Sequence, residues 1–107
     1  MLVRDNEIFE IKADRIPIGY FEIDRDFTLN EIKIEKNDMI YMFSDGIIDQ
    51  FGGPNKKRFM LKKLKEMLQQ IHKRDLSEQK EIIFREFNNW KHDLVQTDDI
   101  MVMGIRF

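Results

Sequence analysis

The sequence lacks cysteine altogether, so the chain can form neither a disulfide nor a metal site with thiolate ligands. It also lacks an apolar run long enough to span a bilayer and a recognisable signal peptide. Neither an internal repeat nor a low-complexity segment is present. These absences favour a cytoplasmic or other reducing setting and exclude membrane contact by this segment.

An excess of positive charge is missing too. Eighteen basic residues stand against twenty acidic ones, which gives a net charge of -2. Proteins that bind nucleic acids or membrane surfaces in general need a basic electrostatic field. We therefore expect no nucleic-acid partner.

The chain has enough apolar residues to fold. Hydrophobic residues make up 42% of the 107 positions, including nine phenylalanines and seven methionines. This length suits one domain or part of one. Because Met1 leads almost directly into a strand-like pattern, the chain is expected to begin partway through a larger domain.

The stretch from Asp38 to Gly53 organises the rest of the prediction. Met39–Phe43 is a continuous apolar run with the length of a buried strand. It ends in Ser44-Asp45-Gly46, where Gly46 gives the turn free backbone geometry. An acidic side chain held at the end of a core strand suits a hard cation. The alternative is that Asp45-Gly46 is only a turn.

The remaining pattern predicts an α+β fold, in which two long helices pack on one face of a mainly antiparallel sheet. The apolar runs also predict burial on both faces of the sheet, which requires a further layer. The expected helices run from an N-cap at Asn55 to His72-Lys73-Arg74 and from Ser77 to Leu94, and the other expected extended segments are Leu2–Val3, Glu7–Lys12, Phe27–Ile34 and Ile100–Phe107.

A second acidic site, Thr97-Asp98-Asp99, stands immediately before the last predicted strand. If this strand and Met39–Phe43 are adjacent and antiparallel, the end of one faces the start of the other. Asp45 and Asp98 would then share a cation such as Mg²⁺ or Mn²⁺, which prefers oxygen ligands. The alternative is a polar loop that leads into a strand.

Several segments resemble motifs of the metal-dependent (PPM-type) serine/threonine protein phosphatases, in the branch typified by SpoIIE and the RsbU-type regulators. The similarity runs nearly end to end with its motifs in order. Residues 1–107 therefore resemble the C-terminal part of one such domain, which has an αββα sandwich fold. The matching segments are Arg15–Gly19, Asp38–Asp49, Phe51–Phe59 and Asp98–Ile105.

The resemblance implies roles for the acidic residues. Asp45 and Asp98 would bind Mn²⁺ or Mg²⁺, and Asp99 would support the loop by hydrogen bonding, with Gly46 in the turn. The implied reaction is hydrolysis of phosphoserine or phosphothreonine on a protein by a metal-activated water. It also implies bacterial signalling, a phosphoprotein substrate and an upstream sensor or regulatory domain.

The sequence departs from the family in one respect. Family members carry an acidic strand and an Asp-Gly motif in an earlier half, and no matching residues stand upstream of Asp45. The chain alone is therefore expected to have little or no turnover. One face of its sheet would be uncovered, which favours a homodimer. The alternative function is a non-catalytic regulatory or interaction domain that keeps a phosphatase-like core.

Three consecutive cations, Lys56, Lys57 and Arg58, fall at the predicted start of the first helix. Cations oppose the helix dipole there, and a bound anion such as a substrate phosphate would resolve the conflict. These residues are therefore candidates for a phosphate contact. The alternative is a solvated basic turn.

Overall fold

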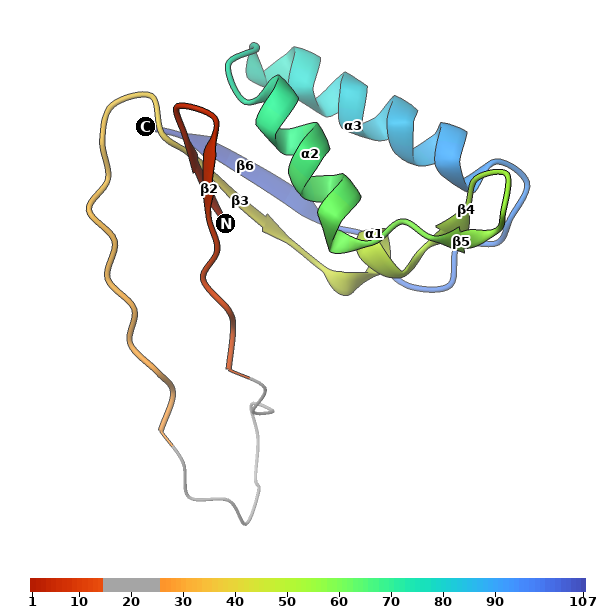
Figure 1. Cartoon of the computed structure of the whole chain (residues 1–107), viewed down its shortest axis with the longest axis horizontal. Coiled ribbons are helices and arrows are strands. Elements are labelled where there is room, and N and C mark those ends of the chain that lie inside the picture. Colours follow the sequence, from red (N-terminus) through yellow and green to blue (C-terminus); the bar gives the residue numbers. More distant parts are fainter. Residues whose placement is uncertain (15–25) are drawn as a thin grey trace.

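The computed structural model describes residues 1–14 and 26–107. Its centre is a four-stranded antiparallel sheet with the strand order β2-β1-β3-β6 (Figure 1). The strands of this sheet are β1 (Leu2–Arg4), β2 (Glu7–Phe9), β3 (Met39–Phe43) and β6 (Val102–Arg106). The segment Arg15–Gly19, part of the family resemblance, lies outside the described residues.

The first two strands form a hairpin, as the turn signal Asp5-Asn6 between the predicted segments Leu2–Val3 and Glu7–Lys12 indicates. Asp5 and Asn6 link them, with φ angles of 45° and 67°. Two successive residues with positive φ are typical of the tight turn that matches the twist of antiparallel strands. Strand β2 ends at Phe9, so it is shorter than the predicted Glu7–Lys12.

Strands β3 and β6 form the central pair. Strand β3 has the predicted bounds, and β6 lies within the predicted Ile100–Phe107. The antiparallel register runs from Met39 opposite Arg106 to Phe43 opposite Val102. The end of β3 therefore lies beside the start of β6, as the acidic-site prediction requires.

Two long helices, α2 (Leu61–Ile71) and α3 (Leu76–Lys91), lie on one side of this sheet (Figure 1). The α+β fold with two helices on one face of an antiparallel sheet is thus confirmed. None of the helices in the described ranges has both the length and the apolar character needed to cross a membrane. The core between helices and sheet consists of Val3, Met39, Tyr41, Ile47, Phe59, Leu64, Leu68, Ile71 and Phe87.

The predicted helix start at Asn55 is wrong. The chain instead forms a small hairpin from β4 (Phe51–Gly52) and β5 (Lys57–Arg58), and α2 begins only at Leu61. Gly53 and Lys56 both have positive φ, which is incompatible with a right-handed helix at these positions. The basic residues His72-Lys73-Arg74 likewise follow α2 rather than form its last turn.

The predicted extended segment Phe27–Ile34 joins no strand. Its large apolar residues are largely exposed, and the exposed fraction reaches 82% for Leu29. The spacing of its apolar residues predicted an extended segment, but none of the described strands pairs with it.

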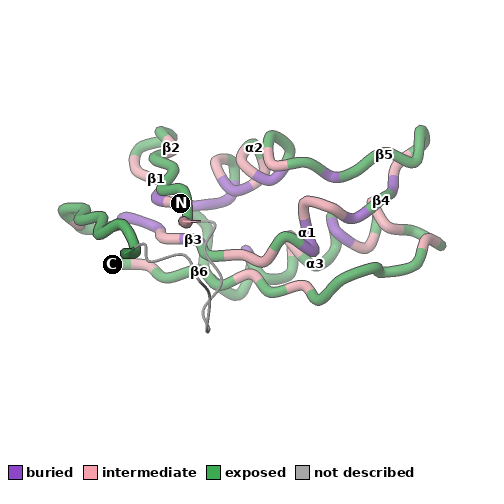
Figure 2. The backbone as a smooth tube through the Cα atoms, turned by 90° about the horizontal axis from the view of Figure 1, so that it is seen from below, coloured by how far each residue is buried: buried purple, intermediate pink, exposed green. Residues whose placement is uncertain are grey.

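The two faces of the sheet differ in burial. Met39 and Tyr41 face the helices and are fully buried, whereas Met42 and Met103 are each 46% exposed. Met42 and Met103 are register partners, and they lie on the helix-free face because side chains alternate along a strand. Figure 2 shows buried residues on β1 and β3 but none on β6. Burial on both faces is therefore not achieved within the described residues.

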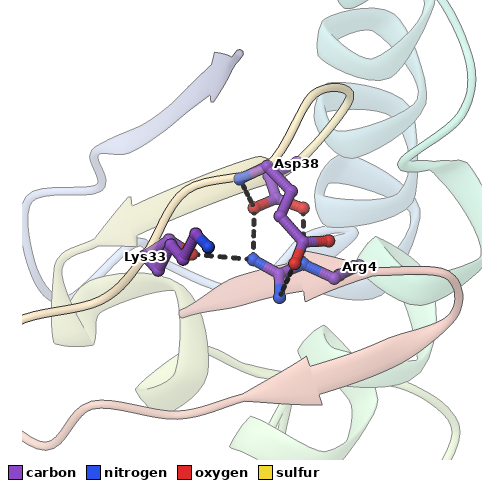
Figure 3. A network of polar contacts seen from close by, with 4 residues as sticks. Arg4, Lys33 and Asp38 are labelled. Carbon is purple, nitrogen blue, oxygen red and sulfur yellow. Dashed lines mark hydrogen bonds and ion pairs between the residues drawn. The ribbon is translucent and has the colours of Figure 1, made fainter.

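A network of polar contacts fastens β1 to the turn that precedes β3 (Figure 3). The Arg4 guanidinium donates to both carboxylate oxygens of Asp38, at 2.8 and 2.7 Å, and to the Lys33 carbonyl at 2.9 Å. Asp38 is almost completely buried and also accepts the Glu35 amide at 2.8 Å. The hydrogen bonds from Arg4 lower the pKa of Asp38 to about 2, although burial opposes them.

We predict that this carboxylate makes stability depend on acid pH. The pKa of Asp38 falls from 3.8 to about 2 on folding. Its contribution is therefore complete above about pH 4 and is lost as the pH falls toward 2. Thermal unfolding should show a lower Tm for Asp38→Asn at pH 6, and this difference should shrink below pH 4. The exposed Glu31→Gln should leave Tm unchanged, and a pH-independent difference for Asp38→Asn would contradict the prediction.

Candidate metal centre

Asp45 stands at the point where β3 has ended. Ser44 keeps an extended backbone, with φ -83° and ψ 159°, and Asp45 is then the first residue of the short helix α1 (Asp45–Asp49). Ser44-Asp45-Gly46 is thus the junction between a strand and a helix rather than a simple turn. The side chain of Asp45 is exposed, so its carboxylate is available to a ligand.

Asp98 and Asp99 lie in the loop that leads into β6, and both are exposed. One carboxylate oxygen of Asp98 accepts the Asp99 amide at 2.7 Å. The Gln96 side chain donates to the Asp98 carbonyl at 3.0 Å. These local bonds give the loop a defined conformation around the Asp98 carboxylate.

Ser44 joins the two acidic segments directly. Its hydroxyl donates to the Asp99 carbonyl and accepts the Met101 amide, both at 2.9 Å. Its backbone amide donates to the Met101 carbonyl, also at 2.9 Å. Ser44, which precedes Asp45, is therefore hydrogen-bonded to Asp99, which follows Asp98. These bonds join positions 55 or more residues apart in the sequence.

Gly46 allows the same two segments to approach closely. A Cβ atom at this position would lie 2.2 Å from the Asp99 carbonyl oxygen, closer than real Cβ atoms come to such an atom. Glycine is thus required here by space, and not for the backbone freedom of a turn that its position in the sequence predicts.

Gln50, which follows α1, makes a further connection that the sequence analysis missed. It is almost fully buried, and its side-chain amide donates to the Val95 carbonyl at 3.0 Å. The backbone carbonyl of Gln50 accepts the indole N–H of Trp90 at 3.0 Å. No local sequence signal marks this role, since a glutamine after a short helix looks like an ordinary surface residue.

The donor set suits a hard divalent cation, because exposed carboxylates bind Mg²⁺ and Mn²⁺. Gly46 lets the two acidic segments pack closely, because a Cβ atom there would meet the Asp99 carbonyl. However, the described residues contain no group of three or more His, Cys, Asp or Glu side chains placed to hold a metal. Asp45 and Asp98 therefore fit as part of a coordination sphere, not as all of it.

A hollow of about 940 Å³ lies beside Asp45. The residues that line it include Met42, Phe43, Ile48 and Glu10. Glu10 is paired with Lys65 at 2.6 Å, which lowers the pKa of this carboxylate. Asp45 itself is exposed and lines this hollow.

The basic residues Lys56, Lys57 and Arg58 lie in the β4–β5 hairpin and are exposed. The guanidinium of Arg58 lies over the Phe51 ring, 5.5 Å from its centroid. The predicted conflict with a helix dipole does not exist, because α2 begins three residues later. A phosphate contact by these residues stays a prediction.

Comparison with known proteins identifies a family and a similar fold. The sequence model of the family described as Stage II sporulation protein E (SpoIIE) matches residues 1–107. The solved SiaA-PP2C domain of Pseudomonas aeruginosa is similar, with 25% identity and a TM-score of 0.74, over 78% of this chain and 34% of that one. No curated protein matches the sequence. The chain thus spans about a third of the solved chain's length and has the fold of part of a PP2C domain.

We predict that Gly46→Ala destabilises the protein, although alanine usually favours a helix. The added Cβ would meet the Asp99 carbonyl at 2.2 Å, so the backbone of one segment must move. Overpacking of this kind costs about 1–3 kcal/mol, which urea unfolding would detect. Gly104→Ala should cost less, because a Cβ atom there would meet only side-chain atoms, the end of Met39 and the Tyr41 ring, both 3.3 Å away. Equal stability of Gly46→Ala and the parent would contradict this prediction.

Proposed function

This chain belongs to the SpoIIE family, and on that premise we propose that it is the C-terminal part of a divalent-metal-dependent protein serine/threonine phosphatase domain. The family match covers every residue, and the solved relative is a PP2C domain. The bound ion would be Mn²⁺ or Mg²⁺.

The observation that carries this proposal is the pairing of β3 with β6. It brings the segment that bears Asp45 beside the segment that bears Asp98. Two carboxylates at one edge of a sheet repel each other in the absence of a cation. Shared coordination of a divalent ion gives their placement a chemical reason.

Each residue has a defined task in this proposal. Asp45 and Asp98 hold the ion through carboxylate oxygens, while Asp99 keeps the loop in place through its backbone hydrogen bonds. Gly46 leaves room for that loop. A bound divalent ion supplies the positive charge that activates water and offsets charge on phosphoryl oxygens.

The chain by itself supplies only part of a phosphatase domain in this proposal. It spans 34% of the solved relative, and its described residues offer no third metal-ligating side chain at the site. We therefore expect little or no turnover by the chain alone. The same observation favours the second candidate, a regulatory or interaction domain with a phosphatase-like core. The phosphoprotein substrate, the upstream sensor domain and the homodimer all stay predictions.

Calorimetric titration with Mn²⁺ tests the proposed ligands. Asp45→Asn and Asp98→Asn should each weaken binding at least about tenfold, since each removes one charged oxygen ligand. Asp93→Asn is the matched control, because it neutralises another exposed aspartate only five positions before Asp98. Its affinity for Mn²⁺ should equal that of the parent.

Two outcomes would contradict the proposal. One is that the parent binds no Mn²⁺, and the other is that all four proteins bind it equally. Turnover of a phosphoserine peptide by the unaided chain would instead contradict the statement that the described residues form an incomplete centre.

The phosphate contact has a separate test. Trp90 is the only tryptophan, and the β4–β5 turn packs against its ring, so its fluorescence reports on this hairpin. Replacing Lys56 and Lys57 with glutamine should weaken binding of a phosphoserine peptide about two- to fivefold for each lysine, the range of exposed charge pairs. Lys36→Gln, an exposed lysine before β3, should have no effect. Equal affinity for all variants would remove these residues from the site.

A further inference from the structure

We propose that Ser44 is the positioning residue that sets the separation of Asp45 and Asp98, and that Gln50 assists it from the other end of helix α1. This inference rests on the proposed function, because it concerns the same pair of carboxylates. Neither residue is assigned as a metal ligand. Both act by fastening the loop of Asp98 to the segment of Asp45.

The Ser44 hydroxyl is fixed by two hydrogen bonds, one in which it is the donor and one in which it is the acceptor. It donates its proton to the Asp99 carbonyl and uses a lone pair to accept the Met101 amide, both at 2.9 Å. A hydroxyl has one donor and two acceptor sites, so this arrangement leaves it no freedom to rotate without losing a bond. The hydroxyl therefore fixes the backbone on both sides of Ile100.

The backbone of Ser44 adds a third connection. Its amide donates to the Met101 carbonyl at 2.9 Å, one position beyond the last register pair of β3 and β6. The backbone hydrogen bonds between the strands thus continue for one more residue. Beyond this point the Ser44 hydroxyl, rather than the backbone, holds the two segments together. Asp45 is covalently next to Ser44, so its position follows from that of Ser44.

Gln50 fastens the far end of the same loop. Its buried side-chain amide donates to the Val95 carbonyl at 3.0 Å. Asp98 lies between this contact and the Ser44 contacts. Helix α1 separates Ser44 from Gln50, and its buried residues Gly46 and Ile47 pack it against the protein. The loop is consequently fixed at two points on one short, packed element.

This arrangement explains why serine, rather than any small residue, stands before Asp45. Alanine would keep the backbone hydrogen bond but would leave the Asp99 carbonyl and the Met101 amide without their hydroxyl partner. Threonine would keep the hydroxyl. Residues that orient metal ligands typically change metal affinity by about 10–100-fold when they are removed.

Nuclear magnetic resonance with Mn²⁺ as the probe tests the inference on the whole chain. Paramagnetic Mn²⁺ broadens amide signals close to it and so reports even weak binding at each carboxylate separately. In the parent, the amides of Asp45-Gly46 and Asp98-Asp99 should broaden at the same Mn²⁺ concentration. In Ser44→Ala, both should need about tenfold more Mn²⁺, and the two segments should respond at different concentrations.

Rescue and control variants separate positioning from general stability. Ser44→Thr should restore the joint response, whereas Ser77→Ala, which removes an exposed serine of α3, should never disturb it. Joint broadening of Ser44→Ala at the parental concentration would overturn the inference. If Asp45→Asn and Asp98→Asn also behave like the parent, the proposed metal site fails as well. If those two lose the response and Ser44→Ala does not, only the positioning role fails.

Discussion

The antiparallel pairing of β3 with β6 is the constraint on which the rest of the structure depends. It joins the middle of the sequence to its last strand, and it supplies the face on which α2 and α3 pack. It also fixes the acidic edge, because the end of β3 and the start of β6 become neighbours only in this register. A slip by one residue would turn Tyr41 away from the core and separate Ser44 from Met101.

The two ends of β3 show how one residue type serves two purposes. Asp38 precedes the strand, is buried, and has its charge neutralised by Arg4. Asp45 follows the strand, is exposed, and has no ion-pair partner within the described ranges of the chain. A buried carboxylate needs an internal cation, and Arg4 supplies it. An exposed carboxylate at a rigid edge is instead available to a cation from solution, which is the basis of the proposed function.

Sequence patterns predicted those elements whose signals are local and strong. The apolar run Met39–Phe43 and the Asp5-Asn6 turn gave the correct strand and hairpin, since turn chemistry and core burial act within a few residues. The helix start at Asn55 failed because the positive φ of Lys56 has no sequence marker as clear as glycine. The contacts of Ser44 and Gln50 could not be predicted from local sequence patterns, because each joins positions more than forty residues apart.

Two features that look independent have one explanation within the proposed function. The helix-free face of the sheet is apolar and exposed at Met42 and Met103, and the acidic edge offers too few ligands to hold a metal alone. Both follow if the chain, which spans 34% of its solved relative, is one part of a larger domain, as the proposed function holds. The proposed function therefore predicts a sheet that is apolar on both faces but covered on one, with an incomplete set of carboxylates at its edge.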